Sequence, residues 1–267
     1  MRRPERPLRF DSAGAVRALR LRSNRDRTHR HFVEGLRSVF AALDAGMAVD
    51  TVVYCERLAP AIAQQRVRRA KREGIPVLRL TPEDFRSLST AAHASGIGAV
   101  LRQHWSTLDG IELRAGTRWL ATGLIRSPGN LGTMLRTAEA AGIDGVIFLG
   151  DESDPFDDRV VAASKGGIFR LRLVRTAHEE FATWAAGQGC RVVGTSPQAV
   201  ADYTTISLDS PIVVIFGEER RGLSSRELEL CTDTVGIHMS GRADSLNVAV
   251  AAGVVLFDLR RRSDSAR

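Results

Sequence analysis

The chain has 267 residues, of which 43% are hydrophobic, so it is long enough for one large domain or two ordinary ones with real cores. The formal charge is +7, and the excess is almost wholly arginine because lysine occurs only as Lys71 and Lys165. No apolar run approaches the roughly 18 residues of a membrane span, which argues against a membrane protein. The 3 cysteines are widely spaced and form no C-x-x-C pair, which argues against a disulfide framework or a zinc site and favours a cytoplasmic location.

Basic residues gather in the first half of the chain. Residues 1–30 hold ten arginines against three acids, and a second cluster occupies residues 66–72. Because the guanidinium group suits phosphate, these clusters predict contact with nucleic acid. The alternative is a frayed basic tail followed by one solvated helix face.

Apolar spacing predicts alternating helices and strands before residue 106. Residues 27–46 carry apolar side chains three and four positions apart, which predicts a helix. The other elements expected here are strands at 51–55, 76–80 and 97–101 and helices at 59–73 and 82–88. This alternation predicts a small α/β domain over residues 1–106, followed by a polar, glycine-containing linker at 107–116.

Residues 117–267 show the same alternation and predict a second domain. Strands are expected at 119–124, 145–149, 171–174, 191–195, 212–216 and 235–237. Helices are expected at 131–141, 156–163, 179–188, 225–231 and 247–260. The apolar strands predict a mostly parallel sheet that is covered on both faces.

Three polar loops that contain glycine adjoin these elements, at residues 127–132, 217–224 and 240–247. In α/β folds, ligands bind at such loops. The chain has no P-loop, no G-x-G-x-x-G after the first strand of either half and no G-x-S-x-G, and its 6 histidines lack metal-ligand spacing. The three loops are therefore the candidate site, and no metal is expected.

The loops carry three ordered sequence patterns. They are Asn130-x-Gly132-x-x-x-Arg136-x-Ala138, Phe216-Gly217-x-Glu219-x-x-Gly222-Leu223-Ser224, and Ile237-x-Met239-x-Gly241 followed by Ser245-Leu246-Asn247-Val248. Together they resemble the motifs of the SpoU/TrmH family, the RNA ribose 2'-O-methyltransferases of the SPOUT class, over residues 117–262. Residues 25–35 and 93–97 are similar, more weakly, to the family's L30e-like substrate-binding domain.

This resemblance implies a fold and an activity. The fold is α/β: a small L30e-like domain with a basic N-terminal extension, then a parallel-sheet SPOUT domain with a deep trefoil knot. The activity is S-adenosylmethionine-dependent 2'-O-methylation of a ribose in ribosomal RNA, with 23S rRNA as the expected target. Antibiotic resistance in an antibiotic-producing actinobacterium is one biological role that the resemblance suggests.

The resemblance also implies which residues surround the cofactor. They are Thr195, Gly217, Ile237, Met239 and Leu246. A side chain at Gly217 would block the approach of backbone to the ligand, which favours glycine there. Ordinary core packing is the alternative for Ile237 and Leu246.

The catalytic residues implied in the same way are Asn130, Arg136, Glu219, Ser245 and Asn247. Because the guanidinium group of arginine holds its proton tightly, we interpret Arg136 as a phosphate clamp and leave a role as base open. Glu219 is expected to hold Arg136 or a loop amide.

Each of these residues also has a plainer interpretation. Arg136 could form only a surface ion pair with Glu139. Asn130 could cap the helix that begins beside it, and Ser245 and Asn247 could cap the last helix. Glu218, next to Glu219, is expected in a solvated loop.

The expected partners are large-subunit rRNA, contacted by Arg25, Arg27 and Arg30, and a second copy of the chain. The family implies a homodimer whose active site borrows groups across the interface, and the last helix has apolar residues to spare. A tRNA ribose methyltransferase and a non-catalytic RNA-binding or ribosome assembly factor are the competing functions.

Overall fold

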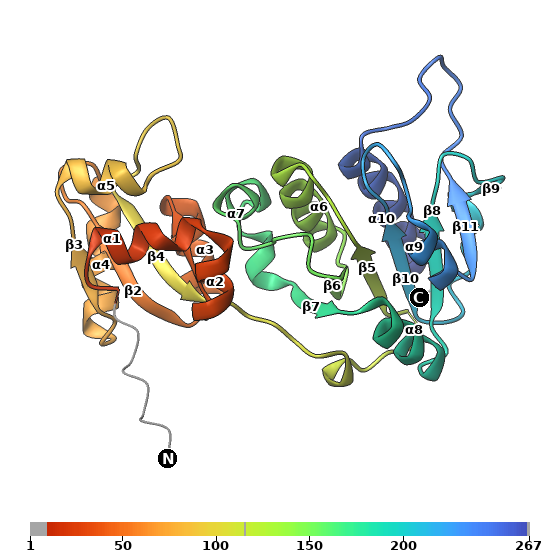
Figure 1. Cartoon of the computed structure of the whole chain (residues 1–267), viewed down its shortest axis with the longest axis horizontal. Coiled ribbons are helices and arrows are strands. Elements are labelled where there is room, and N and C mark those ends of the chain that lie inside the picture. The colour runs from red at the N-terminus through yellow and green to blue at the C-terminus, as the bar shows by residue number, and fades with distance from the viewer. Residues whose placement is uncertain (1–9, 115, 266–267) are drawn as a thin grey trace. The chain divides into compact units, whose positions relative to one another are not determined.

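The computed structural model describes residues 10–114 and 116–265, which form two compact units (Figure 1). The first unit contains the residues up to Gln103 and also Phe156–Phe169, and the second contains His104–Pro155 and the residues from Arg170 onward. The arginines of the expected N-terminal extension before Phe10 lie outside the described residues. The domain boundaries expected from the sequence stay a prediction.

The first unit is built on a mixed four-stranded sheet with the order β1-β4-β2-β3. Its strands are β1 (Arg30–Glu34), β2 (Val49–Tyr54), β3 (Val77–Arg79) and β4 (Ile97–Arg102). Its helices are α1 (Ala13–Arg17), α2 (Arg22–Thr28), α3 (Leu36–Asp44), α4 (Ala61–Arg72), α5 (Pro82–Leu88) and α7 (Asp158–Ser164). Strand β4 runs antiparallel to β1 and β2, whereas β3 pairs parallel with β2. The α/β character expected for this half is confirmed.

The helix expected over residues 27–46 is wrong at its start. Residues 30–34 form β1, in which half-buried and buried side chains alternate, and β1 pairs with β4. The left-handed backbone of His29, with φ 52°, separates β1 from α2, and Gly35, with φ 97°, separates it from α3. Adjacent apolar residues fit a strand as well as a helix, and pairing with the buried strand β4 decides between them.

The second unit is built on a seven-stranded sheet with the order β7-β6-β5-β10-β8-β11-β9, and every pair in it is parallel. Its strands are β5 (Arg118–Thr122), β6 (Gly145–Leu149), β7 (Arg172–Thr176), β8 (Arg191–Thr195), β9 (Ala201–Asp202), β10 (Ile212–Phe216) and β11 (Asp233–Gly236). Its helices are α6 (Pro128–Ala140), α8 (His178–Gly187), α9 (Ser225–Leu230) and α10 (Val248–Ser265). All residues of β6 and β10 are buried, as expected for central parallel strands. The parallel sheet predicted from the sequence is confirmed.

Short 3₁₀ helices occupy Ala18–Arg20, Leu108–Gly110, Gly167–Arg170 and Tyr203–Thr205. The one at Leu108–Gly110 lies within the expected linker. Leu108 and Ile111 are buried in the core of the second unit beside Trp119. That stretch therefore packs as part of the second unit.

Candidate cofactor and catalytic site

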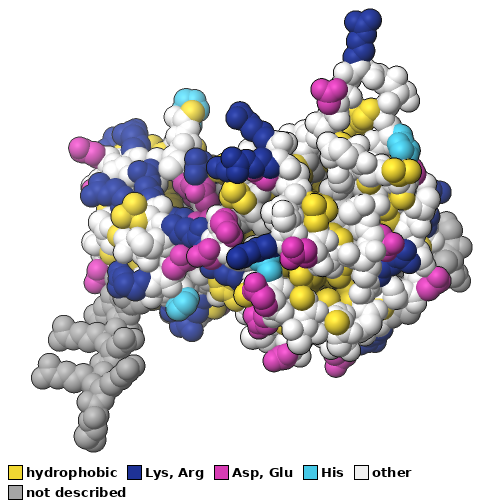
Figure 2. Space-filling view, turned by 45° about the vertical axis from the view of Figure 1, so that its right-hand side comes forward, with side chains coloured by type: hydrophobic (Ala, Val, Ile, Leu, Met, Phe, Trp, Pro, Cys, Tyr) yellow, Lys and Arg dark blue, Asp and Glu magenta, His cyan; other side chains and the backbone are white. Residues whose placement is uncertain are grey.

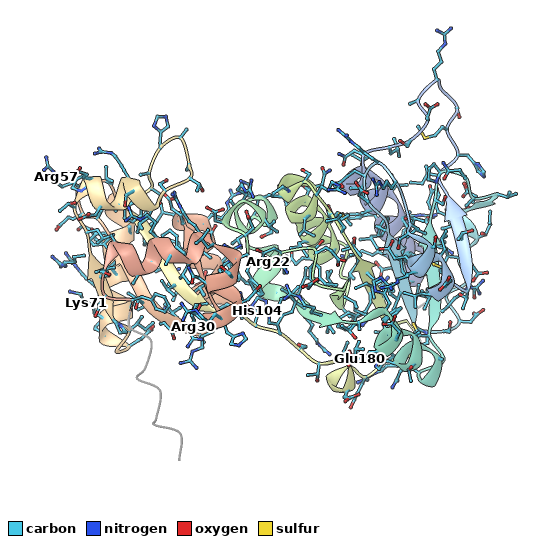
Figure 3. The ribbon with its side chains drawn as sticks, in the orientation of Figure 1. Arg22, Arg30, Arg57, Lys71, His104 and Glu180 are labelled. Carbon is cyan, nitrogen blue, oxygen red and sulfur yellow. The ribbon has the colours of Figure 1, made fainter. Side chains whose placement is uncertain are left out.

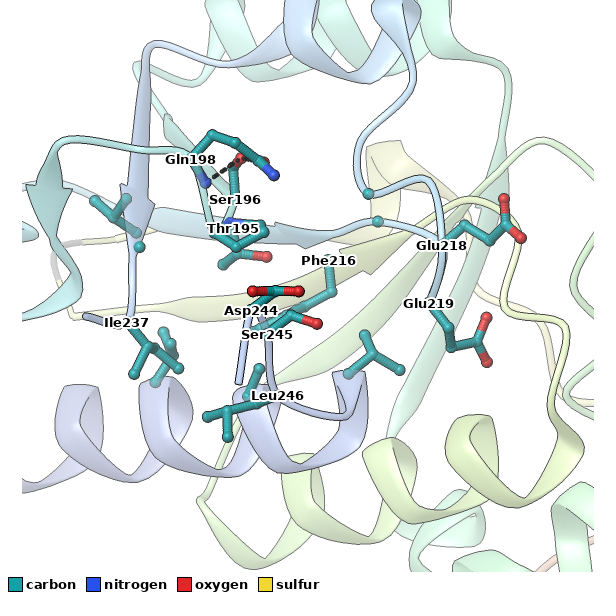
Figure 4. Close-up of a pocket in the computed structure, with 18 of the residues that line it drawn as sticks. Thr195, Ser196, Gln198, Phe216, Glu218, Glu219, Ile237, Asp244, Ser245 and Leu246 are labelled. Atoms are coloured by element: carbon teal, nitrogen blue, oxygen red, sulfur yellow. Dashed lines mark hydrogen bonds between the residues drawn. The ribbon is translucent and has the colours of Figure 1, made fainter. Parts of the chain in front are cut away.

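A pocket with a volume of about 240 Å³ lies at the carboxyl ends of three neighbouring parallel strands (Figure 4). The strands are β8, β10 and β11, in which Thr195 pairs with both Phe216 and Val235. The loops that follow these strands and the start of α10 form its walls. This is the edge at which open parallel sheets bind ligands.

All five residues expected around the cofactor line this pocket: Thr195, Gly217, Ile237, Met239 and Leu246. Ile237 and Leu246 are half-buried and line the pocket, so neither is a fully buried core residue. The hydroxyl of Thr195 donates to the carbonyl of Ile215 at 3.0 Å, which fixes its side chain at the end of β8. The wall therefore combines apolar side chains with a polar side chain that is held in place.

The reason that position 217 is glycine lies within the protein. A Cβ atom at Gly217 would lie 2.2 Å from the carbonyl carbon of Gly222 and 2.3 Å from the nitrogen of Leu223. Glu218 and Gly222 exchange two backbone hydrogen bonds of 2.9 Å, which folds the loop back over Gly217. Glycine at this position was expected to allow the approach of a ligand, whereas the structure shows that the chain's own backbone requires it.

Glu219 organises the loop between β5 and α6. Its carboxylate accepts hydrogen bonds from the backbone nitrogens of Arg126 at 3.2 Å and Ser127 at 3.1 Å, and from Nδ2 of Asn130 at 3.0 Å. Burial raises the pKa of Glu219, but these hydrogen bonds outweigh it and lower the pKa below its ordinary value of 4.5. Arg136 and a loop amide were the two partners expected for Glu219. Glu219 binds loop amides and not Arg136.

Asn130 and Asn247 form the second link. Nδ2 of Asn247 donates to Oδ1 of Asn130 at 3.0 Å, and Oδ1 of Asn247 accepts from the backbone nitrogen of Ala249 at 2.9 Å, which caps α10. Asn130 does not cap α6, because the cap is Ser127, whose hydroxyl accepts from the Asn130 nitrogen at 3.3 Å. The capping interpretation is therefore wrong for Asn130, and Asn247 both caps its helix and reaches Asn130.

These contacts join one residue of each motif into a single hydrogen-bonded chain, from Glu219 through Asn130 to Asn247. Each amide has a donor contact on one side and an acceptor contact on the other, so neither can turn over without losing both. The three motif loops are thereby fixed relative to one another beside the pocket.

Ser245 and Arg136 differ in their position relative to the pocket. Ser245 is exposed and lines the pocket, whereas Arg136 is exposed on α6 and does not line it. Within residues 10–114 and 116–265, the Arg136 guanidinium forms no hydrogen bond or ion pair. Glu139 pairs with Arg170 at 3.3 Å, so the suggested pair between Arg136 and Glu139 is wrong.

Glu218 was expected in a solvated loop, and this expectation is wrong. Its side chain is only 10% exposed, lines the pocket and accepts from Nε of Arg126 at 2.6 Å. Arg221 lies 3.9 Å from its other oxygen. Nothing in the sequence distinguishes Glu218 from a solvated acid, because its partner is 92 positions away.

Two buried residues that were not predicted from the sequence, Glu227 and Ser153, support the loop between β5 and α6. The carboxylate of Glu227 accepts from the backbone nitrogen of Gly123 at 3.1 Å, and Ser153 donates to the carbonyl of Gly123 at 2.6 Å. Ser153 also accepts from the nitrogen of Ile125 at 2.9 Å. Glu227 could have been found from the Ser224-x-x-Glu227 capping box, which the structure contains, but Ser153 carries no comparable signal.

The three arginines expected to bind RNA differ in their availability. Arg25 is 4% exposed, and its guanidinium donates to the carbonyls of Leu19 and Arg20 at 2.7 Å, so it holds a turn together. Arg30 is ion-paired with Asp50 and donates to the carbonyl of Thr28 at 3.0 Å. The expectation that Arg25 contacts RNA at the surface is therefore wrong, because the side chain is buried. The guanidinium of Arg30 is already bound to groups of its own chain. Arg27 is exposed and stays a candidate.

The described residues show no sign of a metal site or a membrane segment. Within residues 10–114 and 116–265, no group of three His, Cys, Asp or Glu side chains could hold a metal ion. No helix in the same ranges is long and apolar enough to cross a membrane.

The parallel sheet and the pocket built from three strand-end loops define an α/β protein with a site for a small organic cofactor. Comparison with protein families gives the class. The SpoU rRNA Methylase family model matches residues 119–257, and a model described as the MRM3-like substrate binding domain matches residues 14–99. The chain belongs to the SpoU rRNA methylase family.

Similar proteins extend over nearly the whole chain. The 23S rRNA (uridine(2479)-2'-O)-methyltransferase of Streptomyces viridochromogenes is 31% identical over 92% of this chain and 88% of its own length. The AdoMet-bound rRNA methyltransferase from Sinorhizobium meliloti is 33% identical, with a TM-score of 0.85 over 94% of both chains. The SpoU methyltransferase AviRb from Streptomyces viridochromogenes, in complex with AdoMet, is 29% identical, with a TM-score of 0.84 over 96% of this chain and 98% of that one.

Proposed function

We propose that this protein transfers a methyl group from S-adenosylmethionine to the 2'-hydroxyl of a ribose in large-subunit rRNA. The observation that carries the proposal is the pocket lined by all five expected cofactor residues, next to the hydrogen-bonded chain of Glu219, Asn130 and Asn247. The names of its relatives support the reaction and the RNA class. Action on rRNA would place the enzyme in the cytoplasm.

The pocket suits the adenosine part of the cofactor. Ile237 and Leu246 offer apolar surface for a flat ring, and the loop after β10 offers backbone groups for its polar edge. Thr195 and Met239 would complete the wall. When bound, the cofactor supplies a methyl group on a positively charged sulfur atom.

The motif residues divide into positioning and substrate-binding roles. A 2'-hydroxyl that attacks a methyl group needs in-line alignment and an acceptor for its proton. Glu219 is ionised, but both its oxygens already accept hydrogen bonds, so we assign it with Asn130 and Asn247 to positioning. Ser245, on the pocket wall, and Arg136 are left free to contact the RNA, with Arg136 as the phosphate clamp.

A second copy of the chain would complete the site. Val250 and Phe257 lie two turns apart on α10 and are 53% and 48% exposed, which is unusual for a helix that packs against α6. Burial of this apolar surface in a homodimer would remove that exposure. Arg136 does not line the pocket of its own chain. A homodimer would allow it to act at the pocket of the other copy.

The test is methyl transfer from labelled cofactor to separate rRNA and tRNA pools, with the modified ribose mapped by primer extension. We expect label in large-subunit rRNA. Label in tRNA alone would assign the enzyme to the competing tRNA class. RNA binding without any transfer would favour the non-catalytic factor.

A variant separates the role of Arg136 from cofactor binding. Arg136→Ala should abolish transfer and leave the calorimetric affinity for S-adenosylmethionine unchanged, because Arg136 does not line the pocket. Full turnover by this variant would remove Arg136 from the site. The suggested role in antibiotic resistance is tested separately, by growth of a susceptible host that expresses the protein on drugs that bind the large subunit.

A further inference from the structure

The outer face of α4 carries an unpaired group of cations that the proposed site does not use. The helix contains five basic residues and no acid. Arg66 pairs with Asp44 at 3.2 Å and lies over the ring of Phe40, and Arg69 pairs with Glu73 at 2.7 Å. Arg68, Lys71 and Arg72 form no hydrogen bond or ion pair in the described part of the chain.

These three residues, which we call the α4 triplet, form one compact surface. Lys71 and Arg72 stand three and four positions after Arg68, so both are neighbours of Arg68 on the helix. All three are exposed, whereas Ala63, Val67 and Ala70 are the buried residues of α4. Figure 3 labels Lys71, whose side chain points away from the unit, and Figure 2 shows several basic side chains, with acidic ones between them, on the visible surface of this unit.

Folding accounts for only part of the α4 triplet. Lys71 and Arg72 lie in the last turn of α4 together with Arg69, where the helix dipole favours cations, but Arg68 lies before that turn. Arg68 is next to both of them on the helix, and like charges at this spacing repel one another. An exposed group of unpaired cations attracts a polyanion.

We propose that the α4 triplet docks on the phosphate backbone of an RNA duplex, a stem of the substrate rRNA, and so identifies how the substrate of the proposed function is held. Arginine and lysine contacts to phosphate provide affinity that is independent of sequence. Helix α4 carries no aromatic residue on which an unpaired base could stack. Duplex RNA, which proteins recognise by its shape and its phosphates, therefore fits this face better than a single strand.

The experiment measures RNA affinity against salt concentration for the wild type and the triple variant Arg68→Ala/Lys71→Ala/Arg72→Ala. Each phosphate contact contributes about 0.9 to the slope of log affinity against log salt on a duplex, so the triple variant should lose about 2 to 3 of that slope. The probes are an RNA duplex of mixed sequence and a single strand of the same sequence. An unchanged slope on the duplex overturns the proposal, and an equal loss on both probes overturns the duplex assignment.

A matched control separates contact from general charge. Arg69→Ala changes the net charge as much as Arg68→Ala on the same helix, but Arg69 is engaged with Glu73. We expect Arg68→Ala to lower the slope by about 1 and Arg69→Ala to lower it clearly less. Equal losses of slope in the two variants would show that the slope depends only on the net charge of the protein, which would overturn the docking proposal. The unfolding temperature of the triple variant should not fall, which excludes misfolding as the cause.

This test does not depend on methyl transfer. If the wild type methylates rRNA and the triple variant binds as the wild type does, the docking proposal fails and the proposed function stands. If the wild type transfers no methyl group but the triple variant loses the salt slope, the docking proposal stands and the proposed function fails.

Discussion

Gly217→Ala tests whether the pocket depends on the fold of the loop after β10. The added Cβ would lie 2.2 to 2.3 Å from the backbone of Gly222 and Leu223, where ordinary contacts begin at 3.4 Å. Because these atoms belong to backbone that is closed by two hydrogen bonds, the loop has to retreat by roughly 1 Å. We expect a loss of about 1–3 kcal/mol in the free energy of unfolding, as for other overpacked sites.

The same displacement should also weaken cofactor binding. The loop carries Glu218 and Glu219, so a shift of roughly 1 Å misplaces both the pocket wall and the support of Asn130, which can reduce transfer about 100-fold. Isothermal calorimetry with S-adenosylmethionine and urea unfolding measure the two effects. Gly187→Ala, at a helical position with no atom within 4 Å of the new Cβ, is the control and should leave both unchanged or raise stability. Wild-type affinity in Gly217→Ala would refute the reasoning.

Four further variants test the described contacts and exposures. Asn247→Asp keeps a good cap for α10 but loses the donor to Asn130, so transfer should fall at least about tenfold while the unfolding temperature holds. Glu219→Gln should cost about 1.5–3 kcal/mol of unfolding free energy. Since the pKa of Glu219 is lowered, this cost should be complete above its ordinary value of 4.5 and shrink as acid protonates the native carboxylate. Arg25→Ala should destabilise the protein by about 1–3 kcal/mol, whereas exposed Arg27→Ala should change stability by less than about 0.5 kcal/mol and weaken RNA binding.

A specific observation would contradict each of these expected effects. Normal transfer by Asn247→Asp would show that the contact with Asn130 is dispensable. A pH-independent difference between the wild type and Glu219→Gln would contradict the lowered pKa. Equal stabilities of Arg25→Ala and Arg27→Ala in urea would contradict the buried role of Arg25.

The sequence predicted the second unit well because its signals are local. Apolar runs fix the central parallel strands, and the second and third motif patterns contain four of the five expected cofactor residues that line the pocket. The helix predicted over residues 27–46 is wrong at its start because Phe32 and Val33 fit the spacing of a helix as well as that of a strand. Only their pairing with β4 decides between the two. The roles of Glu218 and Ser153 depend on partners that are distant in the sequence, and the role of Arg25 depends on its burial, neither of which spacing encodes.

The hydrogen-bonded chain of motif side chains has a consequence for synthesis on the ribosome. Its contacts join residues 89 and 117 positions apart, and the last of them comes from Asn247, at the start of α10. A nascent polypeptide that has emerged only as far as β11 lacks both Leu246 and the partner of Asn130. The competence to modify RNA therefore arises only when α10 has been released and can pack beside α6.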